Sequence, residues 1–289
     1  MQTWTIKGLL DLATGYLADR GVDSPRLCAE LLLAEVLGKP RIGLYTHFDQ
    51  IVDGPALDRL RDLLRRAGKH EPVAYLVGRT EFYSLQIEVN PDCLIPRPET
   101  ELLVERGIEF LRARSGPQLV LDLGTGNGCV AVAIAINCSQ ARVIATDISE
   151  RALAVAARNI HRHGLSEQVS LLAGDLFEPL GRPGDLGGFD LIVCNPPYVA
   201  TPDLAQLAHN VRDYEPRVAL DGGSDGLQVI KKIAEKVGDY LRSGGALMME
   251  IGYQQGPAVL SIIKAHGLVG PRLYKDYQGI DRVLVASKP

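Results

Sequence analysis

From residue 118 onward, short apolar runs alternate with longer segments that carry their apolar residues on one face. This pattern predicts strands at 119–123, 142–146, 169–173, 191–194, 246–251, 269–274 and 283–286. Helices are predicted at 128–137, 150–163, 226–241 and 256–265. Because strands that alternate with helices are typical of parallel sheets, we expect an α/β fold with a mostly parallel seven-stranded sheet. The short connection through Gln278 and Gly279 makes the last strand antiparallel.

The first 78 residues show helical spacing without strands. Ile6, Leu9, Leu10 and Leu17 form one apolar stripe. Ser24 is a predicted N-cap before Pro25, and the helix that follows is predicted to end at Gly38. In a third helix, at 55–68, leucines alternate with arginines. The arginines indicate either a solvated helix face or a docking face for a macromolecular partner.

Partial alternation over 82–89 predicts a hairpin, and a proline-rich segment follows it. Pro96 and Pro98 hold the backbone around Arg97 extended, and Glu99 begins a helix at 100–112. Arg97 and Glu99 either form an ion pair that fixes this hinge or shape a pocket beside it. The predicted division is a helical domain at 1–78, a hairpin linker at 79–97 and an α/β domain at 98–289.

Composition narrows the possible environments and partners. The longest apolar run, 129–136, is shorter than the roughly 18 residues of a membrane span, and no signal segment is recognised. A net charge of −4 argues against broad nucleic-acid binding. Five scattered cysteines without a Cys-x-x-Cys pair fit a reducing cytoplasm and no metal site. We expect a cytoplasmic protein, and a monomer because no large apolar seam is evident.

A glycine loop, Gly124-Thr125-Gly126-Asn127-Gly128, follows the first strand of the sheet. Glycines let the backbone approach a nucleotide closely, and the helix start after them offers free N–H groups. The spacing differs from the Gly-x-Gly-x-x-Gly of dinucleotide sites, and position 129 is Cys. Asp122, two residues before the loop, would repel pyrophosphate. It suits a cationic cofactor that carries an amino acid, such as S-adenosylmethionine.

Acids also end the next two strands. Asp147, followed by Ile148, is placed to accept hydrogen bonds from ribose hydroxyls. Asp175 is placed to bind an adenine amino group, with Leu176 against the ring. Each has a plainer alternative, since the glycine loop alone could be a tight turn, Asp147 a helix N-cap and Asp175 a turn residue. Their position at the ends of successive strands favours a nucleotide-type cofactor site.

Asn195-Pro196-Pro197-Tyr198 follows the fourth predicted strand, at the strand end where open α/β sheets bind ligands. An Asn side chain offers both a donor and an acceptor, and the Pro196 carbonyl can face a ligand. With the Tyr198 ring as a platform, these residues indicate a site for a planar amino or amide nitrogen. Cys194, just before them, is interpreted as a packing residue and not as a nucleophile.

Three segments together, 95–101, 122–128 and 195–198, resemble the release factor glutamine methyltransferases, the PrmC/HemK family. The resemblance covers nearly the whole chain and implies a class I, Rossmann-like methyltransferase fold with a helical substrate-recognition domain. It implies transfer of a methyl group from S-adenosylmethionine to N5 of the glutamine in the Gly-Gly-Gln motif of class-1 peptide chain release factors. S-adenosylhomocysteine would be the product.

By position, the resemblance implies that the loop from Gly124 to Gly128 cradles the methionine part of the cofactor and that Asp147 holds its ribose. Leu176 stands where some relatives carry an aromatic residue. Catalysis is assigned to Asn195, Pro196 and Tyr198, with Asn195 also beside the cofactor. Substrate contacts are assigned to these three residues and to Pro197, Arg97 and Glu99.

Two other substrates remain open at this point. The related ribosomal protein L3 glutamine methyltransferases differ after the arginine of the 95–101 segment. DNA amino-methyltransferases carry the Asn-Pro-Pro-Tyr motif and act on a flipped base, but a basic target-recognition domain is not evident here. Glu215 and Pro216 also resemble a family segment, with no role assigned.

Overall fold

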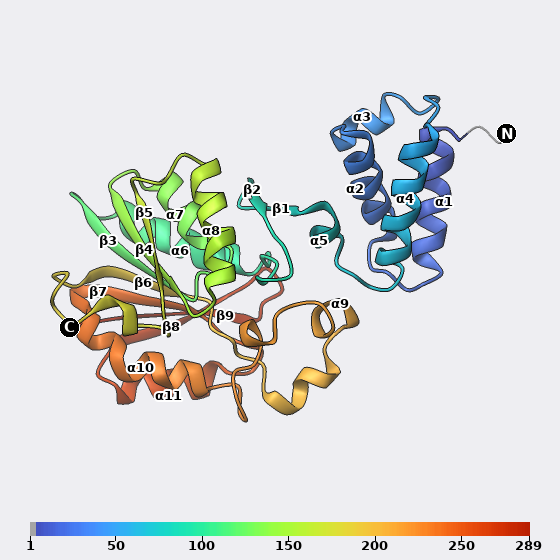
Figure 1. Cartoon of the computed structure of the whole chain (residues 1–289). Helices are drawn as coiled ribbons and strands as arrows, with labels where there is room; N and C mark the ends of the chain where they lie inside the picture. The colour runs from blue at the N-terminus through green and yellow to red at the C-terminus, as the bar shows by residue number, and fades with distance from the viewer. Residues whose placement is uncertain (1–3) are drawn as a thin grey trace. The chain divides into compact units, whose positions relative to one another are not determined.

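The computed structural model describes residues 4–289, which divide into two compact units (Figure 1). The first unit comprises the chain up to Arg79 and the segment Ala208–Tyr214. The second comprises Thr80–Leu207 and Glu215–Pro289. Among the described residues, no helix is both long enough and apolar enough to cross a membrane.

The first unit is helical, as the spacing predicts. Its helices are α1 (Ile6–Ala18), α2 (Pro25–Leu37), α3 (Arg41–Tyr45), α4 (Gly54–Ala67), α5 (Val73–Val77) and α9 (His209–Arg212). The predicted stripe of α1 is buried against leucines of α2 and α4. Helix α2 starts at Pro25 and ends before Gly38, as expected. The Ser24 cap is wrong, because Ser24 has a left-handed backbone (φ 49°) and its side chain makes no capping bond.

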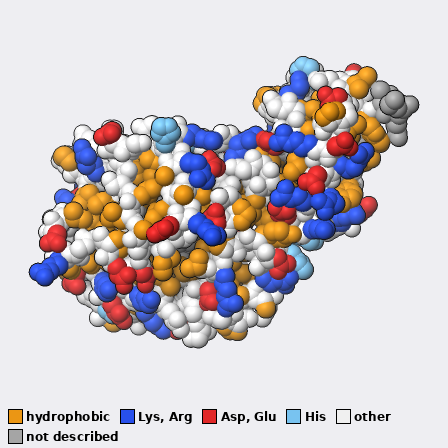
Figure 2. Space-filling model, viewed as in Figure 1, with side chains coloured by type: hydrophobic (Ala, Val, Ile, Leu, Met, Phe, Trp, Pro, Cys, Tyr) orange, Lys and Arg blue, Asp and Glu red, His pale blue; other side chains and the backbone are white. Residues whose placement is uncertain are grey.

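The arginines of α4 are paired within their own unit. Arg61 bonds Asp58 and Arg65 bonds Asp62, each at 2.7 Å and well exposed. Arg59 pairs with Glu35 at 2.9 Å, and Arg66 pairs with Glu71. Figure 2 shows basic and acidic side chains intermingled over this unit. These contacts agree with a solvated helix face whose charges are locally balanced.

The segment Ala208–Tyr214 belongs to the first unit although it is far away in the sequence. The Tyr214 hydroxyl donates to the Lys69 carbonyl at 3.0 Å, and the rings of His209 and His70 stack with centroids 5.4 Å apart. No local pattern predicted this contact, because it joins positions about 140 residues apart in the chain. The chain therefore leaves the α/β unit at 207 and re-enters it at 215.

The second unit is built on the expected seven-stranded sheet, in the order β5-β4-β3-β6-β7-β9-β8. Its strands are β3 (Gln118–Leu123), β4 (Ala141–Asp147), β5 (Val169–Ala173), β6 (Phe189–Cys194), β7 (Leu241–Glu250), β8 (Val269–Lys275) and β9 (Asp281–Ser287). Strand β9 runs antiparallel to both β7 and β8. The predicted fold class is therefore confirmed, with β7 starting five residues earlier than expected.

Helices cover both faces of the sheet (Figure 1). One face carries α6 (Thr100–Arg112), α7 (Cys129–Asn137) and α8 (Glu150–Arg162), and the other carries α10 (Gln228–Tyr240) and α11 (Gly256–Ala265). Strands between two helical layers are buried on both sides, which is why they read as continuous apolar runs. Short 3-10 turns at Glu178–Leu180, Thr201–Gln206 and Arg217–Ala219 had no sequence prediction.

The predicted hairpin forms from β1 (Arg79–Phe82) and β2 (Leu85–Glu88). Its two turn residues, Tyr83 and Ser84, both have positive φ, as two-residue hairpin turns require. The buried Asn159 of α8 then joins the hairpin to the glycine loop. It accepts from the Glu88 N–H at 2.7 Å and donates to the carbonyls of Glu88 and Asn127.

Candidate active site

The sheet register brings the predicted site residues to one edge. Leu123 on β3 pairs with Thr146 on β4 and with Cys194 on β6, and Asp147 on β4 pairs with Ala173 on β5. The glycine loop, the two acids and the Asn-Pro-Pro-Tyr motif follow these positions in the chain. They therefore leave the sheet side by side, at the carboxyl ends of parallel strands where open sheets bind ligands.

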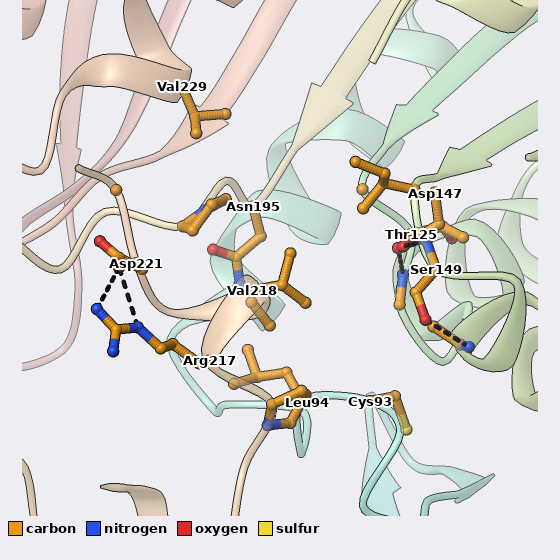
Figure 3. Close-up of a pocket in the computed structure, with 18 of the residues that line it drawn as sticks. Cys93, Leu94, Thr125, Asp147, Ser149, Asn195, Arg217, Val218, Asp221 and Val229 are labelled. Atoms are coloured by element: carbon orange, nitrogen blue, oxygen red, sulfur yellow. Dashed lines mark hydrogen bonds and ion pairs between the residues drawn. The ribbon is translucent and has the colours of Figure 1, made fainter. Parts of the chain in front are cut away.

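A cavity of about 760 Å³ lies at this edge (Figure 3). Most of the predicted residues line it: Arg97, Asp122, Gly124, Thr125, Gly126, Asn127, Asp147, Ile148, Asp175, Leu176, Asn195 and Pro197. Four predicted residues, Glu99, Gly128, Pro196 and Tyr198, are not among its lining residues. Pro196 is buried, although Asn195 and Pro197 on either side of it reach the cavity.

Glycine is needed at the three loop positions for different structural reasons. All have positive φ, at 70° for Gly124, 58° for Gly126 and 80° for Gly128. A side chain at Gly128 would meet the Ala156 Cβ of α8 at 3.1 Å, so this glycine permits close helix packing. A Cβ at Gly124 or Gly126 would meet no atom within 4 Å. These two glycines line the cavity and leave its space open for a ligand.

Asp122 is a buried carboxylate at the base of the glycine loop. Its Oδ2 accepts from the Thr125 hydroxyl at 2.6 Å. Burial raises the pKa of Asp122 to about 7, and the nearby charge of Asp147 adds to the shift. A carboxylate so poorly solvated is stabilised by a positive charge beside it. The carboxylates of Asp122 and Asp147 at this end of the cavity therefore fit a cationic ligand with an amino group and disfavour a pyrophosphate.

Asp147 is held by the loop that it faces. Its Oδ2 accepts from the Gly126 N–H and its Oδ1 from the Ser149 N–H, both at 2.8 Å. Its interpretation as the cap of α8 is wrong, because Ser149 is the N-cap and its Oγ accepts from the Ala152 N–H. Each carboxylate oxygen has further acceptor capacity for a hydroxyl in the cavity. The neighbouring residue Ile148 is 59% exposed and offers an apolar contact there.

At the end of β5, Asp175 and Leu176 line the same cavity. Leu176 has a positive φ of 52°, a conformation that is unusual for a leucine. The Thr146 hydroxyl donates to its carbonyl at 3.0 Å and holds this turn in place. Asp175 lies 3.5 Å from the Lys232 ammonium, which also lines the cavity.

Asn195 belongs to a chain of hydrogen bonds that leads to the buried Glu250. Its Nδ2 donates to the Thr100 Oγ1 at 3.2 Å. The Thr100 hydroxyl donates to Oε2 of Glu250 at 2.6 Å, and the Tyr198 hydroxyl donates to Oε1 at 3.1 Å. Tyr198 thus contacts Glu250 at the end of β7, while the Asn195 carboxamide reaches the cavity (Figure 3).

The ion pair predicted between Arg97 and Glu99 is wrong, because Arg97 pairs with Glu215. Its Nη2 lies 2.6 Å from Glu215 Oε1, and the Glu215 side chain is fully buried. The second oxygen, Oε2, accepts from the Ile95 N–H at 3.2 Å. A buried carboxylate needs a cation and hydrogen-bond donors, and the 95–97 segment supplies both. Glu215 therefore holds the extended segment against the loop that follows it.

That loop forms one wall of the cavity. Pro216, Arg217, Val218 and Ala219 line it, and Arg217 pairs with Asp221 at 3.1 Å (Figure 3). The Val218 side chain is 56% exposed at this wall. This wall therefore presents both an apolar side chain, Val218, and charged side chains, Arg217 and Asp221, to the cavity.

Sequence reasoning gave no role to four residues that shape the site: Thr100, Asn159, Glu215 and Glu250. Glu250 lies one residue before the end of the strand predicted at 246–251 and is the last residue of β7, so attention to acids near strand ends could have found it. Thr100 was recognised only as part of the 95–101 segment and the start of a helix, and Glu215 was noted with no role assigned. Asn159 stands within an ordinary helix pattern, and nothing in the sequence marks it.

The fold is that of a class I methyltransferase. The family described as Methyltransferase small domain matches residues 100–212. The 16S rRNA N2 G1207 methyltransferase of T. Thermophilus, solved in complex with AdoMet and guanosine, has a similar fold. Its TM-score is 0.52 at 20% identity, covering 73% of this chain and 50% of that one.

The sequence relatives identify the family within that class. The family described as PrmC N-terminal domain matches residues 8–78. The release factor glutamine methyltransferase of Geobacter sulfurreducens is 45% identical over 98% of this chain and 96% of its own. That of Rhodopirellula baltica is 40% identical over 99% and 97%. The chain belongs to the release factor glutamine methyltransferase family and is a glutamine methyltransferase.

Proposed function

We propose that this enzyme uses S-adenosylmethionine to methylate N5 of the glutamine in the Gly-Gly-Gln motif of class-1 peptide chain release factors. One observation carries the proposal. The Asn195 carboxamide lines the cavity with its NH2 group bonded to Thr100, so its oxygen is the atom left to accept from a ligand. The glycine loop and its acids line the same cavity.

The lining residues fit this cofactor. Asp122 suits its ammonium group, and Gly124 and Gly126 leave room for it where a Cβ would intrude. Asp147 would accept from the ribose hydroxyls, with Ile148 alongside. Asp175 and Leu176 would contact the adenine. When bound, S-adenosylmethionine supplies an electrophilic methyl group carried on a sulfonium.

A primary amide nitrogen is a poor nucleophile because its lone pair is delocalised into the carbonyl. The proposed role of Asn195 is geometric: its oxygen accepts one amide N–H, and the Pro196 carbonyl accepts the other. Such positioning can contribute several kcal/mol, up to roughly 7–11 in favourable cases. The two acceptors also stabilise positive charge that grows on the nitrogen. Proton loss follows methyl transfer, so no dedicated base is required.

Other residues would shape the entrance and contact the substrate. Tyr198 and Pro197 would flank the amide, and Arg97 and Glu99 would form the entrance for the Gly-Gly-Gln loop. The helical domain at 1–78 would recognise the release factor, with the hairpin at 79–97 as linker and 98–289 as the catalytic domain. We also propose a monomer that acts in the cytoplasm, a reducing compartment that suits five free cysteines.

The test uses purified full-length protein with tritiated S-adenosylmethionine and three acceptors in parallel. The acceptors are a class-1 release factor, ribosomal protein L3 and double-stranded DNA. We expect label on the release factor alone, and mass spectrometry should locate one added methyl on the Gly-Gly-Gln glutamine. Label on L3 or on DNA with none on the release factor would reject the proposal in favour of that substrate.

A further inference from the structure

We infer that Glu250 is a positioning residue that acts through Thr100 to fix which atom of the Asn195 carboxamide faces the cavity. This inference deepens the proposed function and rests on it for the role of Asn195. Glu250 ends β7, and its side chain is buried, with 1% of the residue exposed. It is not among the residues that line the cavity, and hydrogen bonds through Thr100 connect it to Asn195.

The hydrogen bonds have a fixed direction because a threonine hydroxyl has one proton. Thr100 donates that proton to Glu250 Oε2 at 2.6 Å. Towards Asn195 the Thr100 oxygen can then only accept, and it accepts from Nδ2 at 3.2 Å. An ionised carboxylate is an acceptor only, so Glu250 sets the polarity of the whole relay.

The direction of these hydrogen bonds determines whether the substrate contacts the oxygen or the NH2 group of Asn195. The torsion that carries a carboxamide is broadly two-fold, so without a partner Asn195 could present either its oxygen or its NH2 group. A flipped carboxamide would place two donors opposite the donors of a glutamine NH2 group. Two facing donors cannot bond, and each desolvated donor left unpaired carries a cost. The relay therefore selects the acceptor face that the reaction needs.

The surroundings of Glu250 make its ionisation sensitive to acid. Burial raises the pKa of Glu250 above its usual value, and the hydroxyls of Thr100 and Tyr198 and the Arg282 charge on β9 offset only part of that rise. Glu99 at the start of α6 opposes ionisation, and the negative charge of Glu250 in turn helps to raise the pKa of the buried Cys129 and Cys194 thiols. Once protonated, Glu250 could donate to Thr100, which would then donate to Asn195 and reverse the relay. Acid should weaken catalysis by this route.

The kinetic test compares Thr100→Val with Thr100→Ser at saturating S-adenosylmethionine and release factor. Valine keeps the shape and removes the hydroxyl, while serine keeps the hydroxyl. We expect Thr100→Val to lower kcat by about tenfold or more with cofactor Kd near wild type, and to lower Tm because Glu250 Oε2 loses its donor, while Thr100→Ser restores most of the rate and the Tm. The acidic fall in kcat should be present in wild type and Thr100→Ser and absent in Thr100→Val and Glu250→Gln. Equal losses in both Thr100 variants, or wild-type kcat in Thr100→Val, would overturn the relay.

A second readout needs no substrate. The side-chain NH2 resonances of Asn195, assigned by their loss in Asn195→Asp, report the bond to Thr100. We expect slow solvent exchange in wild type, faster exchange in Thr100→Val, and a shift as Glu250 titrates. If wild type methylates no release factor, the proposed function fails. These resonances would still show whether Glu250 and Thr100 orient the Asn195 carboxamide. Identical Asn195 spectra in wild type and Thr100→Val would reject the inference directly.

Discussion

The guanidinium of Arg97 lies 2.6 Å from the carboxylate of Glu215, 118 positions later in the chain. The Glu215 side chain has no exposed surface and that of Arg97 is 28% exposed, so the pair is largely desolvated. It joins the segment before α6 to the loop that begins the cavity wall at Pro216. Two walls of one cavity are thus tied by a single ion pair.

Arg97→Ala should leave a buried carboxylate without its cation. Removing one partner of a buried pair is strongly destabilising, and we expect a loss of about 3 kcal/mol at neutral pH, at the low end of the usual range because the Arg97 side chain is 28% exposed. Burial already raises the pKa of Glu215, so the loss should shrink near pH 5, where the variant's Glu215 takes up a proton more readily. Urea unfolding at the two pH values measures this difference.

The matched control is Arg61→Ala. Arg61 also bonds a carboxylate at 2.7 Å, but both side chains are about three-quarters exposed. Exposed pairs contribute little, so its unfolding free energy should change by less than about 0.5 kcal/mol. Equal losses in the two variants would mean that burial of Glu215 is not the source of the effect.

Gly126→Ala and Gly116→Ala separate backbone strain from loss of cavity space. Both glycines have positive φ, 58° and 82°, and a Cβ at either position would meet no atom within 4 Å. Each alanine should cost about 1–2 kcal/mol of stability, because L-residues resist the left-handed region. Only Gly126 lines the cavity, so only Gly126→Ala should also weaken S-adenosylmethionine binding, measured by calorimetry. Similar cofactor Kd values in both variants would contradict the proposed role of the loop.

Asp122→Asn should change how stability depends on pH. The folded pKa of Asp122 is about 7 and the unfolded value is about 3.9, so the folded state binds the proton more tightly. Its contribution to stability is fully present below about pH 4 and is lost as pH rises through 7, a span on the order of 4 kcal/mol.

In Asp122→Asn this pH dependence should disappear. Urea midpoints of wild type and variant should therefore be compared from pH 4 to 8. As pH rises, the midpoint of the variant should increase relative to that of wild type. A constant difference across this range would show that Asp122 does not titrate there. The variant should also bind S-adenosylmethionine more weakly at pH 8, because it lacks the negative charge that attracts the cofactor's ammonium group.

Asn195→Ala should nearly abolish turnover while S-adenosylmethionine still binds. Loss of one positioned hydrogen-bonding group in an active site typically lowers kcat by about 10²–10³. The control is Asn137→Ala, since Asn137 at the end of α7 donates only to the Ala133 carbonyl of its own helix. We expect near wild-type kcat in the control. A wild-type rate in Asn195→Ala would remove Asn195 from the mechanism.

Local pattern predicted the parts of this fold that depend on local physics. Continuous apolar runs identified the strands because both faces of the sheet are covered, and the glycine loop was recognised by its spacing. Ser24 failed as a cap because its backbone conformation, and not its residue type, decides whether its hydroxyl can reach the helix N–H groups. From the sequence alone, the arginines of α4 could belong to a solvated face or to a docking face. Their carboxylate partners could not be identified locally, because they include Glu35 on another helix.

By itself, the sequence determined the order of strands and helices, the acids and glycines at strand ends, and the motif that marks a planar nitrogen. These follow from hydrophobic periodicity and backbone preferences, which act over a few residues. Only the tertiary structure decided that Glu215 pairs with Arg97, that Asn159 holds the glycine loop and that Glu250 reaches Asn195 through Thr100. Such choices depend on which polar groups are buried together, because a desolvated charge or amide must find its partner wherever the chain brings one.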